Sequence, residues 1–252
     1  MEKEELQLQH RFAELADKAY NQNVYTFTGF LSLSQQDIFL KMANEINRIS
    51  YQMSGGSNDC ERKMLRFGNP EEFGYEEAFP IVCIRIRPLQ KKFAEDFSHR
   101  DVLGALMNLG IERSTLGDIF LADKEAFLFC QEKVAAFICD GLIQVRHTRV
   151  CCEPIENAGD LPVREPVMEE ITVNSERADG VIAKLYHLSR DKSQQLFAEK
   201  KIYVNGRLLE NAGRSLKKDE LITVRGFGRF LYKGICYETK KGKFCVSAEV
   251  YR

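Results

Sequence analysis

The chain has 252 residues, of which 44% are hydrophobic and 29% charged, and its formal net charge is −1. This composition excludes a disordered chain, and it excludes a membrane-embedded one because no apolar run approaches the roughly 18 residues that span a bilayer. The length exceeds that of a typical single domain and predicts two or three folded units.

The chain begins with an acidic, amphipathic stretch, MEKEELQLQHRFAELADKAY. A secretory signal has a basic start and an apolar core, so this stretch predicts a protein that stays in the cytoplasm. Residues 1–75 are expected to form a helical N-terminal region. Ser34 is the expected N-cap of a helix whose apolar side chains recur at helical spacing from Ile38 to Ile49.

Residues 76–155 alternate between predicted strands and helices. Strand patterns cover 79–88, 117–123, 125–131 and 142–152, and helical patterns cover 99–110 and 132–141. Ser98 and Asp101 have the spacing of a capping box at the start of the first helix. The order β-α-β-β-α-β predicts a ferredoxin-like sheet with both helices on one face, a shape shared by many RNA-recognition modules. The shape alone does not establish RNA binding.

Alternation along the first of these strands predicts which side chains project from the face of the sheet that the helices do not cover. Arg85 and Arg87 fall on the open face of the sheet, and Arg149 or Arg146 of the last strand is expected to join them. These arginines form a possible second RNA surface. Phe127 and Phe129 are candidates either for base stacking or for the hydrophobic core, and the sequence leaves both open because no full RNP1 pattern is present.

Residues 156–170 hold prolines, glycine and acids, and they are expected to link the middle unit to the C-terminal one. The charge balance changes beyond this linker. Residues 177–252 contain 17 Lys and Arg against 8 Asp and Glu, a net of +9, which leaves 19 against 29, a net of −10, for residues 1–176. Such a split predicts that the C-terminal unit meets a polyanion.

Motifs for catalysis and metal binding are incomplete. The eight cysteines form no C-x-x-C pair, and most are expected to be core residues. HRD at 99–101 lacks the other parts of a kinase site, and GFG at 226–228 is too short for a dinucleotide fingerprint. We therefore expect no catalytic residue, no metal, no cofactor and no small-molecule substrate: the protein is predicted not to be an enzyme.

The segment 189–206 concentrates cations where a helix begins. Ser189 is the expected N-cap, and Arg190 and Lys192 lie in the first turn of the helix, where positive charge opposes the helix dipole. An anion bound at this helix end would offset that cost. A hairpin is expected to follow, with its turn at Asn205 and Gly206.

This part of the chain resembles the S4 RNA-binding domain. The matching residues are Arg177, Asp179, Ser189, Arg190, Ser193, Leu196, Ile202, Val204, Asn205, Gly206, Asp219, Ile222 and Val224. The sequence departs from the S4 pattern at Ala178, Ser193 and Lys200, where the pattern has Leu, Ala and Gly. Three further stretches, HRDVLGALMNLGIERSTLGDIF, VRGFGRF and ETKKGK, resemble the YlmH family of bacterial S4-domain proteins, and GGSNDCERK approximates that family's N-terminal glycine loop.

The YlmH resemblance implies an α+β protein. It has a helical region over 1–75, a ferredoxin/RRM-like βαββαβ domain over 76–155, a linker over 156–170 and an S4 (αL-type) domain over 171–252. The resemblance also implies a non-enzymatic factor that binds rRNA on the large ribosomal subunit, with tRNA as a further candidate partner. That factor is linked to rescue of stalled nascent chains and to cell division.

The residues expected to bind RNA combine the S4 matches with the cations around them. They are Arg177, Ser189, Arg190, Lys192, Ser193, Lys200, Lys201, Asn205, Arg207, Lys217, Lys218, Arg225, Arg229, Lys240, Lys241 and Lys243. For Ser189 and Asn205 capping and turn geometry are an alternative role, and Asp179 is expected to order a helix instead of touching RNA. Two rival functions stay open at this point: an RNA-modifying enzyme anchored by S4, and a protein adaptor in cell division.

Overall fold

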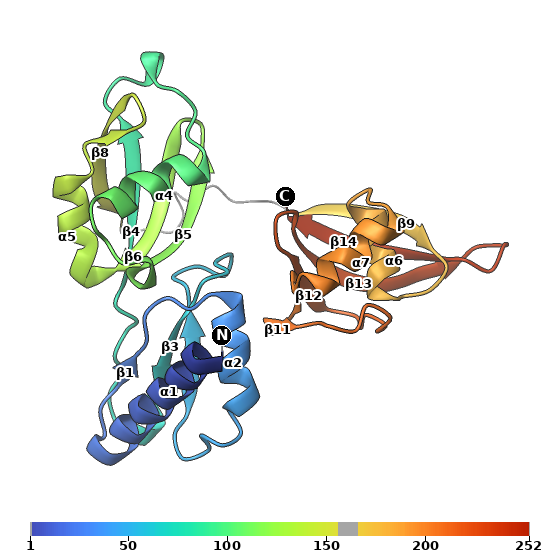
Figure 1. Cartoon of the computed structure of the whole chain (residues 1–252), viewed down its shortest axis with the longest axis horizontal. Helices are drawn as coiled ribbons and strands as arrows, with labels where there is room; N and C mark the ends of the chain where they lie inside the picture. The colour runs from blue at the N-terminus through green and yellow to red at the C-terminus, as the bar shows by residue number, and fades with distance from the viewer. Residues whose placement is uncertain (1, 156–165, 252) are drawn as a thin grey trace. The chain divides into compact units, whose positions relative to one another are not determined.

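The computed structural model describes residues 2–155 and 166–251, which form two compact units, Met1–Pro162 and Val163–Arg252 (Figure 1). Within the described residues, none of the helices combines the length and the apolar character needed to cross a bilayer. Most of the predicted linker, 156–165, lies outside the described residues. Its last residues belong to strand β9 (Val167–Val173), so the C-terminal unit includes residues before the predicted boundary at 171.

The N-terminal part of the first unit contains helices α1 (Glu2–Gln22), α2 (Leu33–Met42) and α3 (Pro70–Phe73). It also contains an antiparallel sheet of order β1-β3-β2, from strands β1 (Thr26–Phe27), β2 (Tyr51–Ser54) and β3 (Met64–Phe67). The predicted helical region is therefore present, and the three-stranded sheet is an addition that the sequence analysis did not expect. The N-cap of α2 is Ser32, not Ser34, because Ser32 and Gln35 complete a capping box.

The middle part contains strands β4 (Ile81–Pro88), β5 (Leu116–Ala122), β6 (Glu125–Gln131), β7 (Gln144–Val145) and β8 (Thr148–Ile155). Helix α4 (His99–Asn108) follows β4, and α5 (Glu132–Gly141) follows β6. The strand order β5-β6-β4-β8-β7 matches the predicted arrangement, in which each βαβ half contributes one outer and one inner strand. The predicted capping box is confirmed: the Asp101 N–H donates to Ser98 Oγ at 3.2 Å and the Ser98 N–H to Asp101 Oδ2 at 3.0 Å.

The two faces of this sheet are covered by different parts of the chain. Ile84 and Ile86 pack with α4 and α5 on one face. On the other face Phe127 and Phe129 are buried in a cluster with Phe30 from the N-terminal part. Base stacking by Phe127 or Phe129 is therefore excluded in this structure, because the N-terminal part occupies the surface where a base would lie.

Hydrogen bonds fix the N-terminal part to the middle sheet. The Arg62 guanidinium donates to the Leu116 carbonyl at 3.0 Å and to the Phe30 carbonyl at 2.7 Å. The Asp118 carboxylate of β5 accepts the Arg62 N–H at 2.9 Å. Burial raises the pKa of Asp118, although backbone hydrogen bonds from Arg62 and Glu61 oppose that shift.

Several cysteines contribute to these cores, as expected. Cys83, Cys130 and Cys245 are buried in β4, β6 and β14 (Phe244–Tyr251). Burial raises the pKa of the Cys83 and Cys130 thiols to about 12, so both stay protonated at neutral pH. They act as small apolar side chains.

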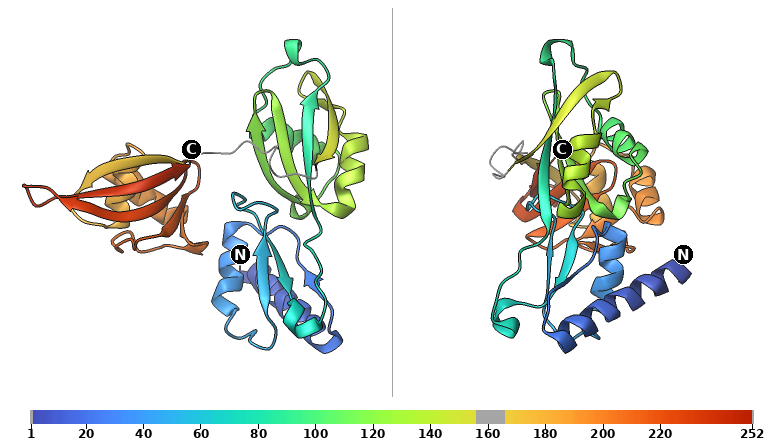
Figure 2. Two further views of the ribbon diagram at one scale, coloured as in Figure 1. Left: turned by 180° about the vertical axis from the view of Figure 1, so that it is seen from behind. Right: turned by 90° about the vertical axis from the view of Figure 1, so that its left-hand side faces the viewer.

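The C-terminal unit is a six-stranded antiparallel sheet of order β11-β10-β12-β13-β14-β9. Its strands after β9 are β10 (Ile202–Val204), β11 (Arg207–Leu208), β12 (Glu220–Val224), β13 (Gly228–Glu238) and β14 (Phe244–Tyr251). Helices α6 (Ala178–Leu185) and α7 (Arg190–Ala198) lie together on one face of the sheet (Figures 1 and 2). Val181, Ile182 and Leu185 of α6 pack there against Phe230 and Tyr232 of β13.

Candidate nucleic-acid interface

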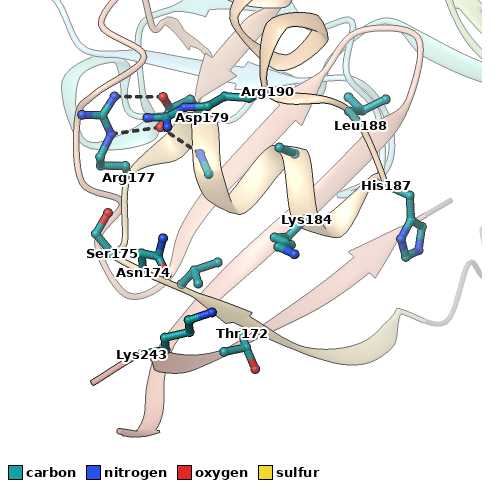
Figure 3. A pocket seen from close by; sticks show the side chains of 13 residues that line it. Thr172, Asn174, Ser175, Arg177, Asp179, Lys184, His187, Leu188, Arg190 and Lys243 are labelled. Carbon is teal, nitrogen blue, oxygen red and sulfur yellow. Dashed lines mark hydrogen bonds and ion pairs between the residues drawn. The ribbon is translucent and has the colours of Figure 1, made fainter. Parts of the chain in front are cut away.

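A groove of about 580 Å³ opens on the C-terminal unit between α6, the end of β9 and the turn that joins β13 to β14 (Figure 3). We call it the C-terminal groove. Its lining residues are Thr172, Val173, Asn174, Ser175, Arg177, Asp179, Gly180, Ala183, Lys184, His187, Leu188, Arg190 and Lys243. Four of them are cations, and among the described residues that line the groove Asp179 is the one acid.

The acid in the groove holds one of the four cations in place. Arg177 donates to both carboxylate oxygens of Asp179, from Nε to Oδ1 at 3.1 Å and from NH2 to Oδ2 at 2.8 Å (Figure 3). The Asp179 side chain is only 2% exposed, and its Oδ1 also accepts the Gly180 N–H at 2.8 Å. Hydrogen bonding from Arg177 is the main cause that lowers the pKa of Asp179, and the Arg190 charge lowers it further.

Helix α7 begins as predicted, with Ser189 at the N-cap. The Lys192 N–H donates to Ser189 Oγ at 3.1 Å, which confirms the capping role. Arg190 is the first residue of the helix, and its side chain lies beside Asp179 at the rim of the groove (Figure 3). Arg190 therefore combines its own charge with the positive end of the α7 dipole.

Ser193, one turn further along α7, is fully buried, and its hydroxyl donates to the Asp179 carbonyl at 2.9 Å. The prediction that Ser193 contacts RNA is wrong for this structure. Its side chain lies between α6 and α7, where a small polar residue can satisfy a buried carbonyl and a larger side chain would not fit.

The predicted hairpin turn is confirmed at Asn205 and Gly206, which both have positive φ, 51° and 81°. The Asn205 Oδ1 accepts the Leu221 N–H at 2.9 Å, so this side chain holds β12 in register. Lys200 also has a positive φ, 54°. That backbone conformation favours glycine, which explains why the S4 pattern has Gly where this chain has Lys.

The other predicted cations lie outside the groove. Three have partners nearby: Lys192 with Gln195 at 3.1 Å, Lys200 with Glu210 at 3.6 Å and Lys201 with Glu199 at 2.6 Å. The Arg229 guanidinium lies 4.8 Å from the centre of the Tyr251 ring. Arg207 is exposed on β11, and exposed loops and turns carry Lys217, Lys218, Arg225, Lys240 and Lys241. Of the predicted cations, the groove brings together Arg177, Arg190 and Lys243.

Two groove residues, Lys184 and His187, were missed by the sequence analysis. Gly180, Ala183 and Lys184 lie at helical spacing along one side of α6, and His187 follows in the turn after the helix, with φ of 53°. A Cβ at Gly180 would meet open space, since no neighbouring atom lies within 4 Å of its position. The alternation of small and basic residues in this segment was the sequence signal that could have predicted these groove residues.

The arginines of the middle sheet lie on the face opposite its helices, as predicted. That face is not open, because the N-terminal part packs on Phe127 and Phe129, and acids compensate two of the arginines. Arg85 Nε lies 2.8 Å from Glu125 Oε2, and Arg87 Nε lies 3.0 Å from Glu153 Oε1. The Glu153 hydrogen bond is the main cause that raises the pKa of Arg87. Arg149 is exposed on β8. RNA binding by this face stays a prediction.

Comparison with known proteins places these features in a family context. Residues 75–158 match a family described as "Putative RNA-binding domain in YlmH". The chain is 30% identical over 227 residues to "Ribosome-associated protein quality control protein P2" of Bacillus subtilis (strain 168), covering 88% of this chain and 86% of that protein. The solved structure of "Cell division protein ylmH from Streptococcus pneumoniae" matches with a TM-score of 0.50 and 20% identity, over 63% of this chain and 95% of that chain. The structural match shows similarity of fold.

Proposed function

Since the chain belongs to the YlmH family, we propose that it is a non-enzymatic RNA-binding factor that binds structured rRNA on the large ribosomal subunit. Its proposed role is quality control of stalled nascent chains on the ribosome, in keeping with the name of its Bacillus subtilis relative. Its place of action would then be the cytoplasm. Peptidyl-tRNA or free tRNA beside the rRNA is a further ligand that this proposal allows.

The observation that carries the proposal is the uncompensated charge of the C-terminal groove. Lys184, Arg190 and Lys243 line it, and the structure shows no ion pair for any of the three within residues 2–155 and 166–251. Phosphates that enter the groove would therefore meet Lys184 and Lys243 without displacing an acid, and Arg190 beside Asp179, whose carboxylate Arg177 already binds. Release of counterions from the RNA then supplies favourable free energy for each phosphate neutralised.

The rigidity of the groove supports structured RNA as the ligand. Its cations come from two packed helices and from a hairpin turn closed by the Thr239 N–H, which donates to the Lys243 carbonyl at 2.7 Å. Cations held at fixed positions favour an RNA whose phosphate backbone has a matching shape. A-form RNA is recognised largely by its shape and by phosphate contacts. In this mechanism the protein binds and orients RNA, and no bond of the RNA is made or broken.

Charge reversal in the groove tests the proposal. The Lys184→Glu/Arg190→Glu variant removes two cations and adds two acids, and we expect its affinity for ribosomal RNA at moderate salt to fall about 100-fold. A matched control is Lys18→Glu/Lys133→Glu, which makes the same charge change at exposed positions of α1 and α5. The measurements are co-sedimentation with large ribosomal subunits and fluorescence anisotropy with a labelled rRNA fragment.

Equal co-sedimentation of the groove variant and the control variant would contradict the assignment. The non-enzymatic part has its own test, crosslinking and sequencing of RNA bound in cells. We expect a cluster of contacts on rRNA, and a single altered nucleotide that depends on the protein would instead identify an RNA-modifying enzyme.

A further inference from the structure

The loop after β4 carries the most exposed large apolar side chain in the described part of the chain. Phe93 is 77% exposed, and Leu89 in the same loop is 58% exposed. The loop projects beyond the ends of the strands in each view of the unit (Figures 1 and 2). Single exposed apolar residues are ordinary, but two of them on one projecting loop, next to several cations, form a surface that can bind a partner.

The loop is fixed in position by the turn between β5 and β6. Lys91 Nζ lies 2.7 Å from Asp123 Oδ2, and Lys124 Nζ donates to the Lys91 carbonyl at 3.4 Å. Lys92 Nζ lies 5.7 Å from the centre of the Phe93 ring. We call this feature the β4 tip, made of residues 89–93 together with Asp123 and Lys124. Two segments of the chain thus hold one exposed aromatic ring among lysines.

The charge of the β4 tip is positive. Asp123 is its acid, and Lys91 pairs with it. Lys92 and Lys124 have no ion pair among the described residues. Arg149 lies next to the tip, because the Leu89 N–H donates to the Arg149 carbonyl at 3.0 Å. Glu95 follows in the loop but pairs with Arg146 at 3.4 Å, and Asp96 after it is exposed.

We propose that the β4 tip binds an unpaired RNA nucleotide, with the Phe93 ring stacked on the base and with Lys92 and Lys124 against the flanking phosphates. An exposed ring between cations is the arrangement by which proteins bind single-stranded nucleic acid, since every base has a face that stacks. This inference depends on the proposed RNA-binding function and adds a second contact. It also assigns stacking to a residue outside the sheet, because Phe127 and Phe129 are buried.

The protein contains no tryptophan, so a single Phe93→Trp substitution reports directly on stacking. The probes are a hairpin RNA with an unpaired loop and a blunt RNA duplex of equal length. We expect the hairpin to quench the indole fluorescence and the duplex to leave it unchanged. The matched control is Phe137→Trp on α5, where Phe137 is 55% exposed in the same unit, and neither RNA should quench it.

Affinity supplies an independent readout. We expect Phe93→Ala to weaken binding of the hairpin about 5- to 30-fold and to leave duplex binding unchanged, whereas Phe93→Tyr keeps the affinity within about twofold of wild type. Thermal melting checks that the exposed substitutions leave the fold intact.

The outcomes separate the two proposals. Equal hairpin affinity for wild type and Phe93→Ala, with an unquenched Phe93→Trp variant, overturns the β4 tip as an RNA site and leaves the C-terminal groove standing. Failure of the wild-type protein to bind either RNA overturns both. Loss of binding in Lys184→Glu/Arg190→Glu for both RNAs, with loss in Phe93→Ala for the hairpin alone, supports both.

Discussion

The middle sheet and the C-terminal groove both gather basic side chains on one surface, and they differ in where the acids lie. On the sheet, each of two arginines faces a glutamate of a neighbouring strand: Arg85 faces Glu125, and Arg87 faces Glu153. The side chain of Glu153 is 44% exposed and that of Glu125 is 15% exposed. Much of the positive charge of this face is therefore cancelled, and one of the two acids, Glu153, is within reach of a ligand.

In the groove the acid lies below the surface. Asp179 is 2% exposed and pairs with Arg177, whose own side chain is 43% exposed. The pair orders Arg177, and among the described residues Lys184 and Arg190 form no ion pair, although the Arg190 charge also acts on Asp179. The number of arginines on a face therefore does not decide whether that face binds a polyanion. The decisive quantity is the charge left after the acids within reach are counted.

The largest effect is expected from removing the buried acid of the groove. Asp179→Asn keeps the shape of the side chain but loses the ion pair with Arg177, and we expect the free energy of unfolding to fall by about 2 kcal/mol. Urea denaturation measures the change. The matched control is Glu153→Gln, because its pair with Arg87 is solvent-exposed on both sides and contributes little. Equal losses in the two variants would remove the distinction between the buried and the exposed pair.

The same variant has a pH signature. The pKa of Asp179 in the folded protein lies below its ordinary value of 3.8. A depressed pKa means that the stabilisation is present above the unfolded value and is lost as the pH falls through the folded one. Wild type should therefore lose its advantage over Asp179→Asn below about pH 4 and keep it at about pH 7.

Local chemistry explains which parts of this comparison the sequence could predict. Ser98, Ser189 and Asn205 act within a few residues of their own position, and all three have the predicted capping or turn role. Strand alternation also placed Arg85 and Arg87 correctly on the face opposite the helices. Short-range hydrogen bonding and the two-residue period of a strand are fixed by the sequence itself.

The parts that the sequence could not predict depend on distant segments. Strand β9 pairs with β14, more than 70 residues later in the chain. Because no local pattern shows this pairing, the mixed acidic and apolar sequence of β9 was assigned to a linker. Burial of Phe127 and Phe129 depends on Phe30 from the N-terminal part. The groove likewise forms only when α6 and the turn before β14 come together, and no local pattern shows that pairing.

The next largest effect is expected from removing the two acids that neutralise the arginines of the middle sheet. Glu125→Gln/Glu153→Gln leaves Arg85 and Arg87 without their acids, so this face should gain charge that phosphates can neutralise. We expect RNA affinity at low salt to rise about threefold and the slope of log affinity against log salt to steepen by about 1. Anisotropy titrations over a range of salt concentrations measure both. An unchanged slope would show that the orientation of this face, and not its charge balance, keeps RNA away.

The smallest effect concerns a cation of the C-terminal unit that lies outside the groove. Lys200 has φ of 54° and pairs loosely with the exposed Glu210 at 3.6 Å. Lys200→Gly removes the strain of a left-handed backbone in the folded state but raises the conformational entropy of the unfolded chain. Because the two effects oppose each other, we expect the free energy of unfolding to rise by only about 0.5 kcal/mol. Lys200→Ala removes the same charge without that relief, so it separates the backbone effect from the electrostatic one. If only the groove's charges count, both variants should bind RNA within about twofold of wild type, and a larger loss in both would extend the binding surface to the end of α7.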